Sequence, residues 1–194
     1  MNLFDILGPV MVGPSSSHTA GAVRIGYISG KLLQDHVVKA EILLHGSFAT
    51  TGIGHGTDKA LIAGLLGMRP DDIRIPDSLF LAKKDGMEFS FSTITLKDAH
   101  PNTAVLRLTG EHGRKIEVQA ASIGGGRILI AKLDGIEVNF SAEKPTLIVH
   151  NVDQPGHVAQ VTSMLAEKQV NIATLQLYRD KRGGYAVMVI ETDQ

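Results

Sequence analysis

Residues 19–45, TAGAVRIGYISGKLLQDHVVKAEILLH, decide the first part of the fold, because the spacing of their apolar side chains changes halfway along. Over residues 19–34 the apolar side chains recur at helical intervals, which predicts an amphipathic helix. They are Ala22, Val23, Ile25, Ile28 and Leu32. Residues 38–45 form a short, largely apolar run, which predicts a strand. Three serines precede the helix, where side-chain oxygens cap the first free N–H groups.

The chain that follows this helix and strand keeps a mixed pattern. Residues 46–56 are predicted to be a loop, and residues 58–68 a second helix, ended by Arg69-Pro70. Short strand-like runs separated by turns come next, at 88–96, 103–108, 115–121, 127–133 and 136–140. Asp134-Gly135 is a two-residue hairpin signal between the last two. We therefore expect an α+β domain over residues 1–141, with helices early and an antiparallel meander late.

Residues 141–145 form a polar linker, after which the pattern restarts. A strand at 146–151, a helix at 155–169 and strands at 171–178 and 185–191 give the order β-α-β-β. This is the front of a ferredoxin-like β-α-β-β-α-β unit, so we expect a second domain over 146–194. The last helix and strand of such a unit are missing. We expect either a truncated chain or a partner that covers the unpaired edge of strand 146–151.

Composition excludes several classes of protein. The 194 residues carry a formal net charge of -1, which gives no footprint for nucleic acid or a membrane surface. There is no cysteine, so this chain forms no disulfide and holds neither an iron–sulfur cluster nor a thiolate zinc site by itself. This composition fits the cytoplasm. The start has no basic segment followed by an apolar run, so we expect no signal peptide, and no apolar run approaches the ~18 residues of a membrane span.

No pair of histidines has the i, i+4 spacing of a helical metal site, so the sequence predicts no metal ligand. Four histidines are interpreted as structural or solvated; they are His36, His45, His112 and His150.

The first segment that can carry chemistry is residues 13–19, GPSSSHT. Hydroxyls and free backbone N–H groups at a helix start form a cradle for a carboxylate or phosphate. His18, in the same turn, can donate to that anion or move a proton. The alternative is an ordinary serine N-cap with an exposed histidine.

Two further segments contain histidine. Residues 47–58, SFATTGIGHGTD, hold His55 between Gly54 and Gly56, where a connecting loop can present the imidazole to a ligand. The alternative is a flexible polar loop. Residues 100–103, HPNT, can supply His100 and Asn102 as hydrogen-bonding groups, or they are a plain proline turn with asparagine at its tip.

Two glycine-containing turns complete the set. In residues 122–127, SIGGGR, Arg127 can pair with a carboxylate, and the alternative is a hairpin turn or bulge. Residues 151–157, NVDQPGH, join a strand to a helix, and their backbone donors can clamp the α-carboxylate of an amino-acid effector. The alternative there is a plain capped turn. The candidate effector residues are Asn151, Asp153, Pro155, Gly156 and His157.

In combination, GPVMVGPSSSHTAGAVRIG, GHGTDKALIAGLLGM, HPNTA and SIGGGRI resemble the β chain of the bacterial iron–sulfur-dependent L-serine dehydratases. The resemblance runs in order along essentially the whole chain. Residues 1 to about 140 resemble the β domain of that family, which is similar to the allosteric substrate-binding domain of some phosphoglycerate dehydrogenases. Residues from about 146 resemble an ACT domain, which responds to amino acids and associates subunits.

The resemblance implies a cytoplasmic, oligomeric lyase of amino-acid metabolism and gluconeogenesis that converts L-serine to pyruvate and ammonia without pyridoxal phosphate. It implies a 4Fe–4S cluster held by a separate α subunit, with the active site between the α and β subunits. His55 would be the base that removes the α-proton, and His18 a second proton-transfer or carboxylate-orienting group. Six further residues would line the same site and bind L-serine; they are Ser15, Ser16, Ser17, Thr19, His100 and Asn102.

Two alternatives to a catalytic subunit stay open. In one, the chain is a purely regulatory module whose N-terminal cradle binds serine allosterically. In the other, it is an adaptor that binds the α subunit and no amino acid.

Overall fold

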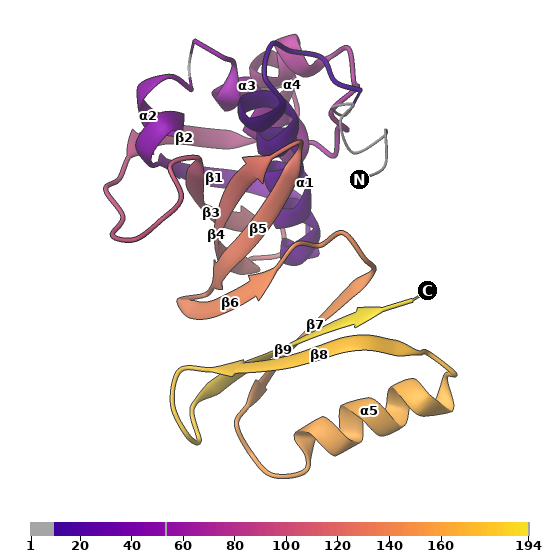
Figure 1. The fold of residues 1–194 in the computed structure, drawn as a ribbon. Helices are drawn as coiled ribbons and strands as arrows, with labels where there is room; N and C mark the ends of the chain where they lie inside the picture. The colour runs from indigo at the N-terminus through magenta and orange to yellow at the C-terminus, as the bar shows by residue number, and fades with distance from the viewer. Residues whose placement is uncertain (1–9, 53, 194) are drawn as a thin grey trace.

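The computed structural model describes residues 10–52 and 54–193, and its first part is built on a six-stranded sheet (Figure 1). The strand order is β2-β1-β3-β4-β5-β6. The strands are β1 Val37–Leu44, β2 Glu88–Thr93, β3 Thr103–Gly110, β4 Lys115–Gly124, β5 Arg127–Leu133 and β6 Ile136–Phe140. β3 to β6 form the antiparallel meander predicted from the sequence. β2 pairs in parallel with β1, so it is not part of that meander.

The helices of this part cluster mainly on one face of the sheet. They are the π-helix η2 Ser16–Gly21, α1 Ala22–Leu33, α2 Gly46–Thr50, α3 Thr57–Leu65, the short 3-10 helix η3 Ile75–Asp77 and α4 Ser78–Lys84. The core lies between α1, α3 and the sheet, and the alternate residues Ala104, Leu106 and Leu108 of β3 are fully buried against it. The opposite face of β3 carries Arg107, which pairs with carboxylates of its two neighbouring strands.

α1 and α3 approach each other through glycines. A Cβ added to Gly26 of α1 would lie 3.0 Å from the Leu65 nitrogen and 3.1 Å from the Cα of Gly64. It would lie nearer still to the Leu61 carbonyl oxygen, inside the 3.0 Å that real Cβ atoms essentially never cross. The two helix backbones are therefore in direct contact, and this contact fixes the position of α1.

Three sequence predictions in this part need correction. The helix predicted from Thr19 starts at Ser16, as a π-turn. The loop predicted at 46–56 contains α2, and α4 was not predicted at all. Both missed helices span seven residues or fewer, which is too short for an apolar repeat to show. Two parallel strands must be joined by a long crossover connection. The connection from β1 to β2, which contains α4, is long enough for this, so β2 can run parallel to β1.

The C-terminal part is a three-stranded antiparallel sheet in the order β7-β9-β8, with the helix α5 on one face. Its elements are β7 Thr146–Val152, α5 His157–Glu167, β8 Ile172–Arg179 and β9 Tyr185–Thr192. This is the β-α-β-β order and strand arrangement of a ferredoxin-like unit, so the predicted α+β class is confirmed. Within residues 10–52 and 54–193, no strand pairs with the other edge of β7.

The two sheets pack against each other, with the C-terminal sheet between α5 and β6 (Figure 1). Val187 and Val189 of the central strand β9 are buried in the same core as Phe140 of β6. The Tyr178 hydroxyl of β8 donates a hydrogen bond to the Asn139 carbonyl oxygen at 3.2 Å. The two parts therefore contact each other directly, in addition to being joined by the linker.

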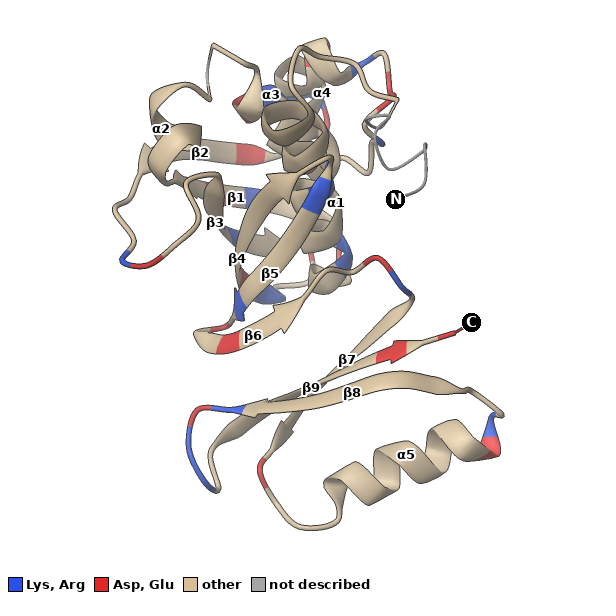
Figure 2. Cartoon of the chain, viewed as in Figure 1, with Lys and Arg blue, Asp and Glu red and all other residues tan. Residues whose placement is uncertain are grey.

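Charged side chains are distributed over both parts with their signs interspersed, as expected for a nearly neutral chain (Figure 2). In the described residues, no helix is both long enough and apolar enough to span a bilayer.

Candidate active site

His18 lies in the π-turn η2 and is held by hydroxyls on both sides of its ring. Ser15 caps the turn, because its side-chain oxygen accepts a hydrogen bond from the His18 backbone N–H at 3.2 Å. The Ser15 and Ser17 hydroxyls lie 3.5 and 3.3 Å from His18 Nδ1. On the other side, His18 Nε2 lies 3.1 Å from the Ser47 hydroxyl and 3.2 Å from the Thr51 hydroxyl.

Ser47 and Thr51 come from α2 and the residue that follows it. Their i, i+4 spacing places both hydroxyls on one face of the turn, 3.2 Å apart. Phe48 of the same helix is fully buried, and its ring meets the His18 ring edge-on with 5.4 Å between centroids. The sequence did not single out Ser47, Phe48 or Thr51, because α2 was predicted to be a loop. The signal that could have found them is the pair of hydroxyl residues four positions apart.

His55 lies beside His18 on the turn that precedes α3. The two ring centroids are 5.1 Å apart and the rings are tilted by 45°. The His55 backbone N–H donates to the carbonyl oxygens of Thr51 and Gly52, at 3.2 and 3.1 Å, so the backbone is anchored. The side chain is exposed, and in the part of the chain that the structure describes its imidazole nitrogens have no hydrogen-bond partner. It is free to meet a ligand or a partner chain.

Two local features hold this arrangement together. Gly56, next to His55, has φ +72°, a left-handed conformation that side chains with a Cβ adopt at a cost, so glycine is required at that bend. The hydroxyl of the fully buried Thr57 donates a 3.1 Å hydrogen bond to the His18 carbonyl oxygen. The start of α3 is therefore tied directly to the π-turn.

The electrostatic environment favours a neutral His18. Burial lowers the pKa of its imidazole below the ordinary value, and the neighbouring His55 lowers it further, while a hydrogen bond to the Ser47 backbone acts in the opposite sense. A neutral imidazole can accept a proton, whereas an imidazolium can only donate. The His18 imidazole is thus suited to accepting a proton.

The turn at residues 100–102 lies against the start of α2. The Pro101 carbonyl oxygen accepts the Ser47 backbone N–H at 2.8 Å, and the Asn102 carbonyl oxygen accepts the Ser122 N–H at 2.9 Å. His100 is exposed, and its Nδ1 accepts the Asn102 backbone N–H at 3.1 Å. The structure thus brings residues 100–102 next to α2, but no contact joins the His100 and Asn102 side chains to His18.

The other candidate site residues near the N-terminus differ in how deeply they are buried. Ser15, Ser16 and Ser17 are half-buried and line the approach to His18. Thr19 is only 2% exposed, so its hydroxyl faces the interior rather than an incoming ligand. The sequence predicted Thr19 as a substrate-binding residue, and its burial argues for a packing role against Gly13, where an added Cβ would be 2.6 Å from the Thr19 hydroxyl.

The glycine-rich segment at 122–127 forms the hairpin turn between β4 and β5. Gly124, Gly125 and Gly126 all have positive φ, as a tight turn requires, and Arg127 is exposed. Ser122 is buried against Gly21, at the end of η2. This segment therefore supports the π-turn from behind, and Arg127 is not part of the histidine cluster.

The predicted effector segment lies in the C-terminal part, on the turn from β7 to α5. Asp153 accepts hydrogen bonds from the Arg179 guanidinium at 2.7 Å and from the Gly183 N–H at 3.1 Å. These donors hold the pKa of Asp153 below its ordinary range, with the Gly183 backbone contributing most. The Asn151 amide lies 3.3 Å from His157 Nδ1, and Gly156 caps α5 with φ +96°.

The residues of this chain do not fit an iron–sulfur cluster. Such clusters are held by cysteine thiolates, and the 194 residues contain no cysteine. Among the described residues there is also no group of three or more His, Asp or Glu side chains placed to hold a metal ion.

Comparisons with known proteins agree with the order of these segments. The family model for the serine dehydratase beta chain matches residues 2–133, and the ACT domain model matches residues 145–194. The chain is 39% identical over 192 residues to an L-serine dehydratase beta chain of Peptoniphilus asaccharolyticus, covering 98% of this chain and 86% of that one. It is 40% identical over 193 residues to a probable L-serine dehydratase beta chain of Bacillus subtilis, covering 100% and 87%. A D-3-phosphoglycerate dehydrogenase of Bacillus subtilis is 25% identical over 174 residues, which span 33% of its length.

Proposed function

The chain belongs to the serine dehydratase β-chain family, and on that premise we propose that it is the β subunit of an L-serine ammonia-lyase that forms pyruvate and ammonia. The observation that carries the proposal is the contact between His18 and His55, 5.1 Å between ring centroids, in segments 37 positions apart in the sequence. One imidazole is fixed by hydroxyls and the other is exposed. This is the arrangement that a proton transfer from an entering substrate needs.

In the reaction, L-serine loses its α-proton and its β-hydroxyl, and the resulting 2-aminoacrylate tautomerises to an imine that water hydrolyses to pyruvate and ammonia. His55 is the base that takes the α-proton, because its ring is exposed and lies beside that of His18. His18 orients the substrate or accepts the proton from His55. Ser15, Ser16 and Ser17 bind the carboxylate, with His100 and Asn102 contributing to the same site, while the buried Thr19 supports the turn from the inside.

The proposal also includes an iron–sulfur cofactor and a partner subunit that holds it, since this chain has no cysteine. With no cysteine, it does not hold a 4Fe–4S cluster, and we assign that cluster to a separate α subunit that meets the exposed His55. The cluster would supply Lewis-acid chemistry at the substrate hydroxyl. The β subunit would work as a cytoplasmic oligomer in amino-acid metabolism and gluconeogenesis.

The division of labour within the chain is part of the proposal. Residues 1–141 form the catalytic β domain and residues 146–194 an ACT domain. An amino-acid effector binds at Asn151, Asp153, Pro155, Gly156 and His157. The positive-φ Gly156 leaves the first N–H groups of α5 open at this turn, which supports the assignment.

The test is reconstitution of the α and β subunits under anaerobic conditions with iron and sulfide, followed by serine-dependent pyruvate formation. His55→Ala should lower kcat by about a hundredfold or more, the scale of general-base catalysis, without changing subunit assembly on a sizing column. His36→Ala is the control, because His36 is also exposed and lies outside the cluster. Full turnover by His55→Ala would refute the catalytic role. If that variant instead alters only equilibrium binding of L-serine to the isolated chain, the regulatory alternative is correct.

A further inference from the structure

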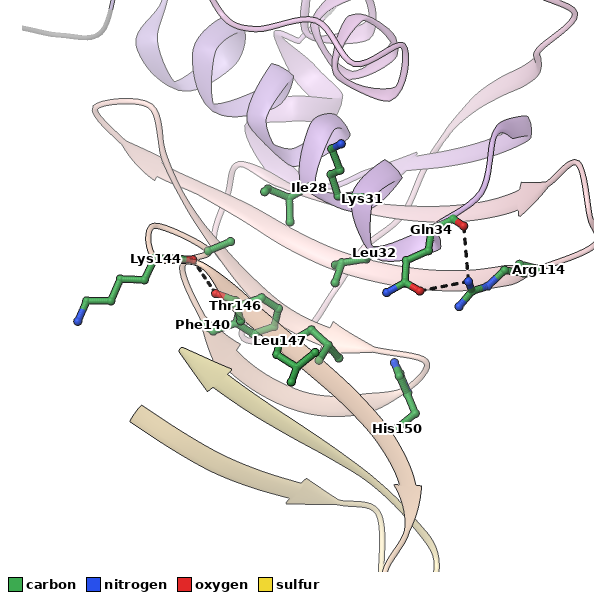
Figure 3. Close-up of a pocket in the computed structure, with 12 residues that line it drawn as sticks. Ile28, Lys31, Leu32, Gln34, Arg114, Phe140, Lys144, Thr146, Leu147 and His150 are labelled. Atoms are coloured by element: carbon green, nitrogen blue, oxygen red, sulfur yellow. Dashed lines mark hydrogen bonds between the residues drawn. The ribbon is translucent and has the colours of Figure 1, made fainter. Parts of the chain in front are cut away.

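A cavity lies between the two sheets, and neither His18 nor His55 lines it (Figure 3). It measures about 300 Å³ and is formed by the C-terminal half of α1, the end of β6, the first residues of β7, and Arg114 from the turn before β4. His18 is at the other end of the same helical segment, beyond the N-terminus of α1. The cavity therefore belongs neither to the proposed active site nor to the turn before α5.

The floor of this cavity is apolar. It is made by Ile28 and Leu32 of α1, Phe140 of β6, and Leu147 and Ile148 of β7. Figure 3 shows Leu147 and Phe140 lying side by side beneath Leu32. Leu147 remains 40% exposed although its neighbours belong to the shared core, which is the state of a side chain that lines an open cavity.

The rim is cationic. The charged residues that line the cavity are Lys31, Arg114 and Lys144, the imidazole of His150 lies beside them, and no aspartate or glutamate lines the cavity. In the described residues none of these four side chains forms an ion pair. Among residues 10–52 and 54–193, Arg114 donates only to Gln34, at 3.2 Å to the side-chain oxygen and 3.5 Å to the backbone oxygen, so most of its five N–H donors stay available there (Figure 3). A guanidinium with free donors beside apolar surface is suited to an anionic ligand that has an apolar part.

We propose that this cavity binds a small organic carboxylate that has an apolar tail and no ammonium group. The tail covers Leu32, Phe140 and Leu147, and the carboxylate meets Arg114, with Lys31 adding positive potential and His150 a further hydrogen-bonding group. A free amino acid fits less well, because its ammonium group would sit among cations with no carboxylate to pair it. The size of the cavity is at the small end of ligand pockets and suits a molecule of about ten non-hydrogen atoms.

Because of the position of the cavity, a bound ligand would stabilise the packing of the two parts of the chain. One wall comes from α1 and the other from β7, so the bound carboxylate contacts both parts of the chain. A ligand that binds only their packed arrangement stabilises that arrangement in proportion to its differential affinity. This effect is independent of the proposed lyase activity, so either can fail without the other.

The test is calorimetric titration of the complete 194-residue chain with 4-methylpentanoate. We expect saturable binding, accompanied by a rise in the unfolding temperature that grows with ligand concentration. Arg114→Gln should weaken binding about tenfold, the loss of one charge-assisted hydrogen bond. Lys115→Gln is the matched control, since it removes the same charge one residue along, on a side chain outside the cavity.

Three comparison measurements sharpen the result. Leu147→Phe, which fills the cavity, should weaken binding at least as much as Arg114→Gln. The neutral 4-methylpentan-1-ol and the zwitterion L-leucine should each bind more weakly than 4-methylpentanoate. The proposal is overturned if 4-methylpentanoate does not bind saturably, if Arg114→Gln or Leu147→Phe leaves its affinity unchanged, or if either comparison ligand binds as tightly.

Discussion

Replacing Gly26 with alanine should destabilise the protein, because the added methyl group enters the contact between α1 and α3. The new Cβ would be 3.0 Å from the Leu65 nitrogen and 3.1 Å from the Gly64 Cα, and closer than that to the Leu61 carbonyl oxygen. All three are backbone atoms, so no flexible side chain can move aside and the helices must separate.

The magnitude follows from two opposing terms. Overpacking of a tight interior costs about 1–3 kcal/mol and occasionally more, and a contact with rigid backbone belongs at the upper end. Alanine recovers about 0.8–1.0 kcal/mol over glycine in a helix. The free energy of unfolding should therefore fall by about 2 kcal/mol. With a urea m-value of about 2 kcal/mol/M, the midpoint should move down by about 1 M.

Gly30→Ala provides the matched control on the same helix. Its Cβ would meet Leu65 at 3.7 Å, an ordinary van der Waals distance, so only the helix-propensity gain remains. Gly30→Ala should raise the urea midpoint slightly, and Gly26→Ala should lower it, both measured by far-UV circular dichroism. If the two variants unfold at the same urea concentration, the close helix contact is wrong.

Three further predictions concern other parts of the molecule. Ser47→Ala removes a hydrogen bond to His18 Nε2 and should lower kcat of the reconstituted enzyme about tenfold with little change in KM. Asp35→Asn should lower the pKa of His112, which the Asp35 carboxylate raises by its 2.8 Å hydrogen bond, as followed by NMR titration. The paired Asp35 has a lowered pKa and His112 a raised one. The ion-pair part of the stability lost in that variant should therefore be present between those two pKa values and disappear as pH falls through the first or rises through the second. Gly156→Ala, at φ +96°, should cost about 1–2 kcal/mol in the C-terminal unit, measured by hydrogen exchange in β7 and β9.

For each of these three predictions, a specific result would contradict it. Thr50→Ala removes a hydroxyl from the same helix that bonds only backbone oxygens, so a loss of kcat equal to that of Ser47→Ala would deny Ser47 a specific role. An unchanged His112 titration in Asp35→Asn would show that the ion pair does not form in solution. Unaltered exchange in Gly156→Ala would mean that the turn adopts another conformation.

The sequence predicted the strands well, because each is a run of apolar or alternating residues bounded by glycine or aspartate turns. The paired turns Asp134-Gly135 and 180–184 are examples, and both lie between antiparallel strands in the structure. From the sequence, β2 was predicted to belong to the meander, because a six-residue strand does not indicate whether its neighbour runs parallel or antiparallel to it. That information lies in the length of the crossover, which includes the unpredicted α4.

The candidate site was predictable as a set of residues but not as a geometry. His18 and His55 stood out because serines and glycines surround them. The hydroxyls of Ser47 and Thr51 did not stand out, because serine and threonine are common in loops and their importance arises only when α2 turns them toward His18. Thr19 was predicted to bind substrate and is buried in the structure, since residues in one polar motif point in different directions once the turn is formed.

The π-turn at Ser16–Gly21 has a consequence for the spacing of the motif itself. A π-turn accommodates an extra residue without lengthening the helix that follows, so it works as a one-residue insertion ahead of α1. If the turn relaxed to ordinary α-helix with no residue removed, the residues upstream of it would rotate by about 100° around the helix axis. The imidazole of His18 would then leave Ser47 and Thr51 while α1 stayed in place. The rotational phase of this helix, more than its composition, is what keeps the two histidines facing each other.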